Sequence, residues 1–186
     1  MKSWKLLFIV FLLITSKPSW AQTDTIPWSD NVKLSWTDFK GVPDKTSPFF
    51  AYTSYSMNIS YSYTVGIINV RLGCYFEGDK SWVKKDKEKD SLLMHEKGHF
   101  AIAEIFARKA RKSITDTVVT KSNINEVIKA IYNKASIDCS SYQAQYDNET
   151  KHSVIYPKQV EWLKKIYSEL NSLKAYSNTV VTKNIQ

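Results

Sequence analysis

Apolar and polar residues alternate along the chain from Phe49 to Thr64, with a polar residue at almost every second position. A period of two places the two sets of side chains on opposite faces of a strand, and the aromatic and Ser/Thr content suits a half-buried strand. Val65-Gly66 provides a bend, and Ile67 to Phe76 forms a second run with one apolar face. The two runs predict an antiparallel hairpin. Leu34-Ser35-Trp36 predicts a further short strand before it.

Three later segments repeat apolar residues at helical spacing. The first predicted helix covers residues 90–112. The second begins near residue 123, and the pattern leaves open whether it continues to residue 149. The third follows Pro157, a residue favoured in a first helical turn. Strands followed by helices indicate an α+β fold, here a small antiparallel β-sheet followed by three helices. Residues 22–176 are predicted to form a single domain, and residues 177–186 a polar tail that frays.

The N-terminal residues have the pattern of a targeting segment. Lys2 and Lys5 give a positive start, an unbroken run of nine apolar residues follows, and Ser19-Trp20-Ala21 offers the small residues of a cleavage site. Nine residues are too few to span a bilayer, which needs about 20. Residues 1–21 are therefore predicted to be a cleaved signal peptide, with a retained short anchor as the alternative. Export to the periplasm or the extracellular space follows.

The charge of the mature chain argues against a nucleic-acid partner. Removing residues 1–21 removes three lysines, so the formal net charge falls from +8 to +5. The remaining basic residues are interleaved with acids, as on a solvated surface, and no nucleic-acid-binding module is recognisable. No membrane-spanning segment is predicted after signal cleavage, and the pattern does not indicate an oligomeric state.

Cys74 and Cys139 are the only cysteines, and both belong to the mature part. Export would place them in an oxidising compartment, where an even pair commonly forms a disulfide. A Cys74–Cys139 bond would close a loop of about 65 residues and stabilise the fold by about 4 kcal/mol in the chain-entropy model. Two buried free thiols are the alternative.

The most specific chemistry lies in the run His95-Glu96-Lys97-Gly98-His99, which reads H-E-x-x-H within the first predicted helix. Residues four apart lie on one helix face, so both imidazoles can reach a single metal ion. The carboxylate of Glu96 then stands where it can take a proton from water. This is the arrangement of a zinc hydrolase, with a zincin-like active-site helix. A helix that merely carries two polar rings is the alternative.

A catalytic zinc needs a third protein ligand. His152, the remaining histidine, is the favoured candidate, in a polar cluster that also contains the competitors Asp147 and Glu149. Glu104 is a further competitor, but at about 100° per residue it points away from His95 and suits a residue packed behind the site or a surface acid paired with Arg108. Tyr142, Tyr146 and Tyr156 are all candidates to donate a hydrogen bond to an oxyanion, and the sequence does not favour one of them.

Several of these residues stand in an order that resembles the bacterial domain-of-unknown-function family 922, regarded as predicted secreted zinc-dependent proteases. The elements are Trp36-x-Asp38-Phe39-x-Gly41-x-Pro43, Ser81-Trp82-Val83, His95-Glu96-x-Gly98-His99-Phe100, Ala107-Arg108 and Tyr146-Asp147-x-x-Thr150-x-His152. The resemblance covers residues 28–170 and implies the same fold and site placement. Two positions depart from it: Ala101 stands where the family often has Asp, and Ser153 where it often has Gly.

The sequence thus predicts an exported zinc-dependent metallohydrolase, specifically a peptidase that acts on a peptide or protein substrate. One zinc ion per chain would be bound by His95, His99 and His152, with Glu96 as the general base. The alternative function is a non-catalytic, zinc-stabilised binding module of the cell envelope.

Overall fold

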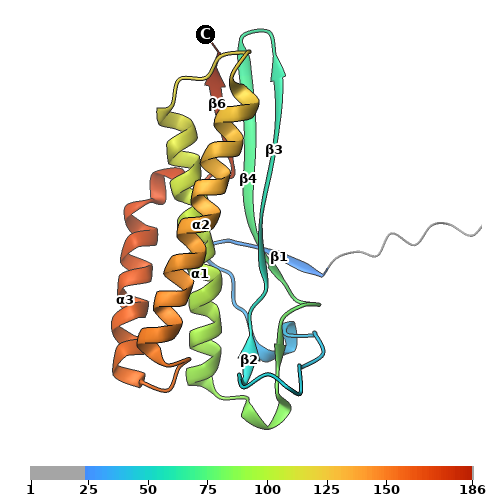
Figure 1. The fold of residues 1–186 in the computed structure, drawn as a ribbon, viewed down its shortest axis with the longest axis vertical. Helices are drawn as coiled ribbons and strands as arrows, with labels where there is room; N and C mark the ends of the chain where they lie inside the picture. Colours follow the sequence, from blue (N-terminus) through green and yellow to red (C-terminus); the bar gives the residue numbers. More distant parts are fainter. Residues whose placement is uncertain (1–23, 186) are drawn as a thin grey trace, which may run out of the picture.

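The structure is a computed structural model that describes residues 24–185 (Figure 1). The predicted signal peptide, residues 1–21, lies outside the described residues. The strands are β1 (Thr25–Pro27), β2 (Ala51–Tyr52), β3 (Tyr55–Thr64), β4 (Ile67–Glu77), β5 (Trp82–Val83) and β6 (Val180–Asn184). The helices are α1 (Asp90–Asp116), α2 (Ile124–Thr150) and α3 (Tyr156–Ser172), with short 3₁₀ turns at Trp36–Asp38, Lys85–Lys87 and Lys174–Tyr176.

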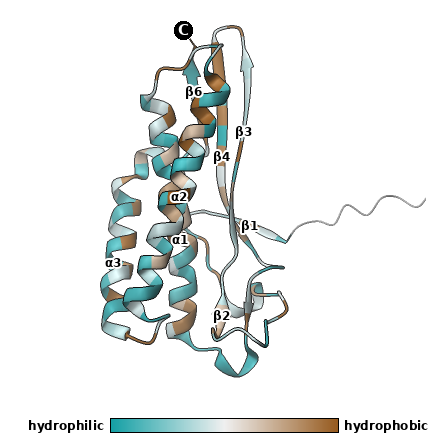
Figure 2. Ribbon diagram, viewed as in Figure 1, coloured by the Kyte–Doolittle hydropathy of each residue, from teal (hydrophilic) through white to brown (hydrophobic). Residues whose placement is uncertain are grey.

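The predicted hairpin is confirmed as β3 and β4, which pair antiparallel from Tyr55 opposite Phe76 to Thr64 opposite Ile67. Gly66 occupies the turn with a φ of 76°, a left-handed conformation that glycine adopts without steric penalty. Alternate residues of β4 are buried and form the sheet's contribution to the core: Ile68, Val70, Leu72, Cys74 and Phe76. Figure 2 shows the hydrophobic colour along β4, where it faces the helices.

Two short strands share the other edge of β4. β1 pairs with its C-terminal residues 75–77, and β6 pairs with its N-terminal residues 67–71. The predicted strand that began at Phe49 is interrupted after Tyr52, because the backbone N–H of Ser54 donates to the Ser81 hydroxyl at 2.9 Å. β2 therefore pairs with β5 in a separate two-stranded sheet.

The three helices form a layer against the sheet, as predicted, so the α+β assignment is confirmed (Figure 1). α1 is buried on most sides, since it packs against β4, α2 and α3. It extends four residues beyond the predicted end, to Asp116, and α2 is one continuous helix as far as Thr150. α3 has Pro157 in its first turn, as expected. Among residues 24–185, no helix combines the length and hydropathy that a membrane crossing requires.

Two local predictions were wrong. Leu34-Ser35-Trp36 does not form a strand, because the carboxylate of Asp38 accepts hydrogen bonds from the Ser35 N–H and hydroxyl and closes a 3₁₀ turn. The tail does not fray throughout, because its residues 180–184 form β6. The ammonium of Lys183 donates to carbonyls at the end of α1, including that of Thr115 at 2.7 Å, so this strand also satisfies helix-end acceptors.

The predicted disulfide is not formed in the structure, where Cys74 and Cys139 are both buried free thiols. They lie between the sheet and α2, and burial raises the pKa of both thiols. The thiolate is the reactive form of cysteine, so both buried thiols are expected to react slowly in the folded state. The alternative of two buried free thiols is the one observed.

Candidate metal centre

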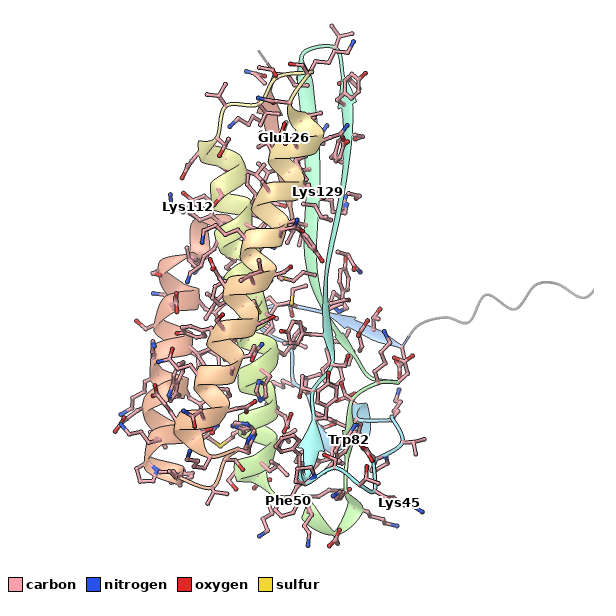
Figure 3. All side chains as sticks on the ribbon, in the orientation of Figure 1. Lys45, Phe50, Trp82, Lys112, Glu126 and Lys129 are labelled. Atoms are coloured by element: carbon pink, nitrogen blue, oxygen red, sulfur yellow. The ribbon has the colours of Figure 1, made fainter. Side chains whose placement is uncertain are left out.

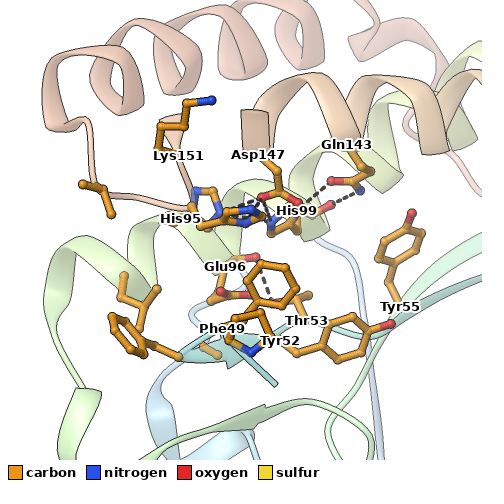
Figure 4. A pocket seen from close by; sticks show the side chains of 16 residues that line it. Phe49, Tyr52, Thr53, Tyr55, His95, Glu96, His99, Gln143, Asp147 and Lys151 are labelled. Carbon is orange, nitrogen blue, oxygen red and sulfur yellow. Dashed lines mark hydrogen bonds and ion pairs between the residues drawn. The ribbon is translucent and has the colours of Figure 1, made fainter. Parts of the chain in front are cut away.

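Three histidine side chains converge on one carboxylate at one end of the helical layer. His95 and His99 come from α1, and Asp147 comes from α2. The Oδ1 atom of Asp147 lies 3.0 Å from His95 Nε2, 3.1 Å from His99 Nε2 and 3.2 Å from His152 Nδ1. The two Nε2 atoms of α1 are 3.2 Å apart. Figure 4 shows His95, His99 and Asp147 meeting above Glu96.

His152 reaches this cluster because the chain reverses directly after α2. Lys151, His152 and Ser153 have φ angles of 49°, 51° and 71°, a run of three left-handed residues without a glycine. Backbone hydrogen bonds hold the reversal, among them His152 N–H to the Asp147 carbonyl at 3.1 Å. Left-handed backbone is unfavourable for residues with a Cβ atom. Such strain concentrates at functional sites, where surrounding contacts enforce it.

Glu96 lies beside the cluster and is almost completely buried. The hydroxyl of Thr53, in the segment after β2, donates to Glu96 Oε2 at 2.6 Å. This bond fixes the carboxylate toward the cleft that both residues line. Oε1 receives no hydrogen bond from any other residue among those the structure describes. A fixed carboxylate with one free oxygen, next to converging imidazoles, can accept a proton from a bound water.

Two glutamines contact the other ring nitrogens of the helix histidines. Gln143 of α2 places its Oε1 2.6 Å from His99 Nδ1, and Gln159 of α3 places its Oε1 2.9 Å from His95 Nδ1. Both glutamines are buried. Each imidazole is therefore held at Nδ1 by a buried amide, which restricts the rotation of its ring.

The groups of the cluster shift one another's pKa values toward their charged forms. Burial acts to raise the pKa of Asp147, but its contacts with His95 and His99, which donate to it when their rings are protonated, outweigh burial and hold that pKa well below its ordinary value. Burial acts to lower the pKa of His99, but the bond to Asp147 and the nearby Glu96 carboxylate raise it overall. Both shifts reflect an anionic site that attracts a cation.

A cleft of about 530 Å³ opens onto the cluster. Its walls are mainly apolar, and the Phe49 ring lies 4.4 Å from the imidazole of His152, centroid to centroid. Tyr52 and Tyr55 line the same cleft, and Figure 4 shows both on the side away from α3. Phe50, beside Phe49, is about half exposed, and Figure 3 places it with Trp82 at the end of the molecule where the cleft lies.

The other predicted candidates lie outside the cluster. Glu104 pairs with Arg108, as expected, but the pair is buried and not at the surface, and Glu104 also pairs with the buried Arg111. Glu149 accepts a hydrogen bond from the Trp162 indole at 2.8 Å. Of the three competitors for a third ligand, only Asp147 is near the histidines.

The tyrosines proposed as oxyanion donors do not line the cleft. The Tyr142 hydroxyl donates to Glu169 at 2.9 Å. The Tyr146 hydroxyl is buried against Gly98 and donates to the His95 carbonyl at 3.3 Å. Tyr156 is exposed at the start of α3.

Sequence reasoning missed four residues of the site: Thr53, Tyr55, Gln143 and Gln159. Gln143 stands one helical turn before Asp147, so once Asp147 was a candidate, the i, i+4 relation could have indicated it. Gln159 and Thr53 belong to no recognisable motif, and Tyr55 is one of eleven tyrosines.

Comparison with known proteins gives one family. No curated protein and no solved structure showed a significant match. Residues 77–153 match the model of a family described as bacterial protein of unknown function (DUF922). The matched segment begins at the end of β4, contains α1 and α2, and ends at Ser153, so all four members of the His/Asp cluster lie within it. It is by this segment, from Glu77 to the reversal after α2, that the chain is similar to the DUF922 family.

Proposed function

We propose that this protein is an exported zinc-dependent metallohydrolase and, more narrowly, a peptidase. The observation that carries the proposal is the convergence of three imidazole nitrogens within 3.2 Å of one carboxylate oxygen, beside the buried Glu96 and at the end of a cleft. Export is inferred from the N-terminal sequence.

The donor set fits zinc. Imidazole nitrogens and carboxylate oxygens are ordinary zinc ligands, and three protein ligands are typical of catalytic sites. His95, His99 and His152 would hold the ion, and the negative charge of Asp147 would balance it. A zinc ion bound at these residues supplies Lewis acidity, which activates water and polarises the carbonyl of a substrate.

Glu96 performs the proton transfers in this proposal. Its free Oε1 takes a proton from the attacking water and then delivers it to the nitrogen of the leaving amine. The Thr53 hydroxyl holds Oε2, so the carboxylate keeps its orientation through both transfers.

The edge of β2 supports a peptide substrate. The N–H of Lys84 donates to the Phe50 carbonyl at 2.8 Å, on the side of β2 that pairs with β5. Because backbone groups alternate along a strand, those of Ala51 face away from β5, and Ala51 is one of the residues that line the cleft. An extended peptide can add to such an edge as a further strand, with its backbone beside Glu96.

A non-catalytic zinc-binding module is the second candidate, and Asp147 is the observation in its favour. Its Oδ1 is within reach of all three histidines. Four protein ligands would close the coordination sphere, as in structural zinc sites. The apolar cleft and the free oxygen of Glu96 favour the enzyme, since a structural site needs neither.

The test compares the mature protein with its Glu96→Gln and His95→Ala variants, and with Glu88→Gln as a matched control at an exposed glutamate. Zinc is measured by elemental analysis, and cleavage is measured on unfolded protein and peptide substrates. The proposal expects one zinc in the wild type, retained in Glu96→Gln with a loss of activity of about 100-fold or more. Zinc without cleavage in the wild type supports the binding module, and equal activity in Glu96→Gln rules out the mechanism.

A further inference from the structure

We propose that two hydrogen-bond relays select the tautomers of His95 and His99. Each relay starts at the backbone carbonyl of the histidine and ends at the Nδ1 atom of its own ring. The relay at His95 runs through Tyr146 and Gln159, and the relay at His99 runs through Gln143. Both rings are thereby held with a proton on Nδ1 and a lone pair on Nε2, directed at the cluster. This inference deepens the proposed function, because it rests on the same site and names the positioning residues that prepare it for a metal.

The relay at His99 has one intermediate. The side-chain nitrogen of Gln143 lies 2.9 Å from the His99 carbonyl, which can only accept a hydrogen bond. The NH₂ group must therefore face that carbonyl, and the amide oxygen must face the ring. At 2.6 Å from that oxygen, His99 Nδ1 can only be a donor. The proton is thus on Nδ1, and Nε2 is free to bind a metal.

The relay at His95 has two intermediates. The His95 carbonyl accepts the hydroxyl proton of Tyr146 at 3.3 Å. The Tyr146 oxygen then accepts from the NH₂ group of Gln159 at 2.7 Å. The amide oxygen of Gln159 faces His95 Nδ1 at 2.9 Å, so this nitrogen also has to donate. Tyr146 and Gln159 are fully buried, which leaves no solvent exposure through which water could substitute for either partner.

The two relays have a joint consequence at the cluster. The Nε2 lone pairs of His95 and His99 face each other at 3.2 Å, and both face the Asp147 carboxylate oxygen. When both rings are neutral, these three lone-pair donors have no hydrogen between them and repel one another unless a proton or a metal ion lies among them. The relays therefore arrange the site for a metal ion before it binds. Hydrogen bonds of this kind to metal-ligating histidines typically contribute 10- to 100-fold in metal affinity.

The variants and their controls distinguish the loss of a relay from a general loss of stability. Tyr146→Phe removes only the hydroxyl of the His95 relay and keeps the ring stacked 4.6 Å from that imidazole. Gln143→Leu removes the acceptor at His99. Tyr142→Phe is a matched control on the same helix as Tyr146, since it loses a hydrogen bond to Glu169 of α3 without touching the cluster. Gln145→Leu is the control for an exposed glutamine, which bonds Glu149.

Two measurements decide the inference. The ¹⁵N shifts of the imidazoles are recorded in zinc-free protein at mildly alkaline pH, and zinc affinity is measured by competition with a chromophoric chelator. We expect Nδ1–H tautomers at His95 and His99 in the wild type and in both controls. We expect a mixture at His95 in Tyr146→Phe and at His99 in Gln143→Leu. Zinc affinity should fall about 10-fold in Tyr146→Phe and by up to about 100-fold in Gln143→Leu.

An Nε2–H tautomer at either histidine of the wild type overturns the inference, whatever the protein binds. So do unchanged tautomers and unchanged zinc affinity in folded Tyr146→Phe and Gln143→Leu. If the wild type shows the Nδ1–H tautomers but binds no zinc, the proposed function fails and the inference about the relays stands. If a variant does not fold, the wild-type spectrum still decides.

Discussion

The hydroxyl of Tyr146 lies in the space that a side chain at position 98 would need. A Cβ atom built on Gly98 would overlap the Tyr146 oxygen and lie 2.8 Å from the adjoining ring carbon. Gly98 stands between the two histidines of the H-E-x-x-H run, on the turn of α1 that faces α2. Glycine at this position therefore lets α2 bring Tyr146 under His95.

Gly98→Ala should displace Tyr146 and destabilise the fold. Overpacking of a buried contact typically costs about 1–3 kcal/mol, and alanine recovers up to about 1 kcal/mol of helix propensity. We expect a net loss of about 1–2 kcal/mol in urea unfolding of the zinc-free protein, together with weaker zinc binding. Ser113→Ala, at an exposed position of α1, is the control and should be neutral or stabilising. If Gly98→Ala stabilises the protein as much as Ser113→Ala does, the displacement of Tyr146 has no cost in free energy of unfolding, and the prediction is wrong.

Ser153→Gly should stabilise the protein. Ser153 has a φ of 71°, and glycine adopts this conformation without the steric cost that a Cβ atom brings. The gain should be about 0.5–1 kcal/mol after the larger entropy of glycine in the unfolded chain is subtracted. Melting temperature should rise by about 1–4 °C. Ser177→Gly, where φ is −72°, should give no gain, and a gain of equal size there would contradict the explanation.

Glu104→Gln should be strongly destabilising and leave the metal site intact. Its Oε1 lies 2.9 Å from Arg108 Nε and 2.6 Å from Arg111 Nη2, with all three side chains buried. Removing one charge of a buried ion network typically costs about 3–5 kcal/mol. Lys109→Gln, at a more exposed position of the same helix, should have little effect. Zinc affinity of folded Glu104→Gln should equal that of the wild type, and a large fall would make Glu104 a ligand.

Both thiols should remain free in the native protein and react slowly. Alkylation after unfolding without a reductant should add two adducts, detected by mass spectrometry, and Cys139→Ser should add one. Burial raises the pKa of Cys74 and Cys139 above 9.0, so the folded state keeps these protons where the unfolded state loses them. The free energy of unfolding should therefore fall as pH rises above 9.0. No adducts without a reductant would restore the disulfide predicted from the sequence.

The hairpin, the helices and the HExxH run were predictable because their signals are local. Alternation over β3 and β4 and helical spacing in α1 each extend over ten residues or more. β6 was not predictable in this way, since five residues with Thr182, Lys183 and Asn184 among them give no apolar stripe. Its stability comes from β4, which no local pattern can indicate.

The residues of the candidate site also differ in whether a local sequence pattern indicates them. His95, Glu96 and His99 follow from one helix turn, and His152 was indicated only because histidines are few. The central position of Asp147 depends on how α2 crosses α1, which the sequence does not state. Gln143 and Gln159 act through hydrogen-bond direction, so only the fold gives their neutral amides a role.

The pairing of β6 with β4 joins residues that are far apart in sequence: Thr182 hydrogen-bonds Asn69, 113 positions away. Such a contact adds to the contact order of the fold. A high contact order slows folding, because the chain loses the entropy of a long loop before the paired residues gain their contacts. The hairpin can form early from neighbouring residues, whereas residues 67–71 of β4 have no partner on their other edge until β6, which follows all three helices in the chain, has been placed. Until then these residues present an unpaired strand edge, which can pair with another chain.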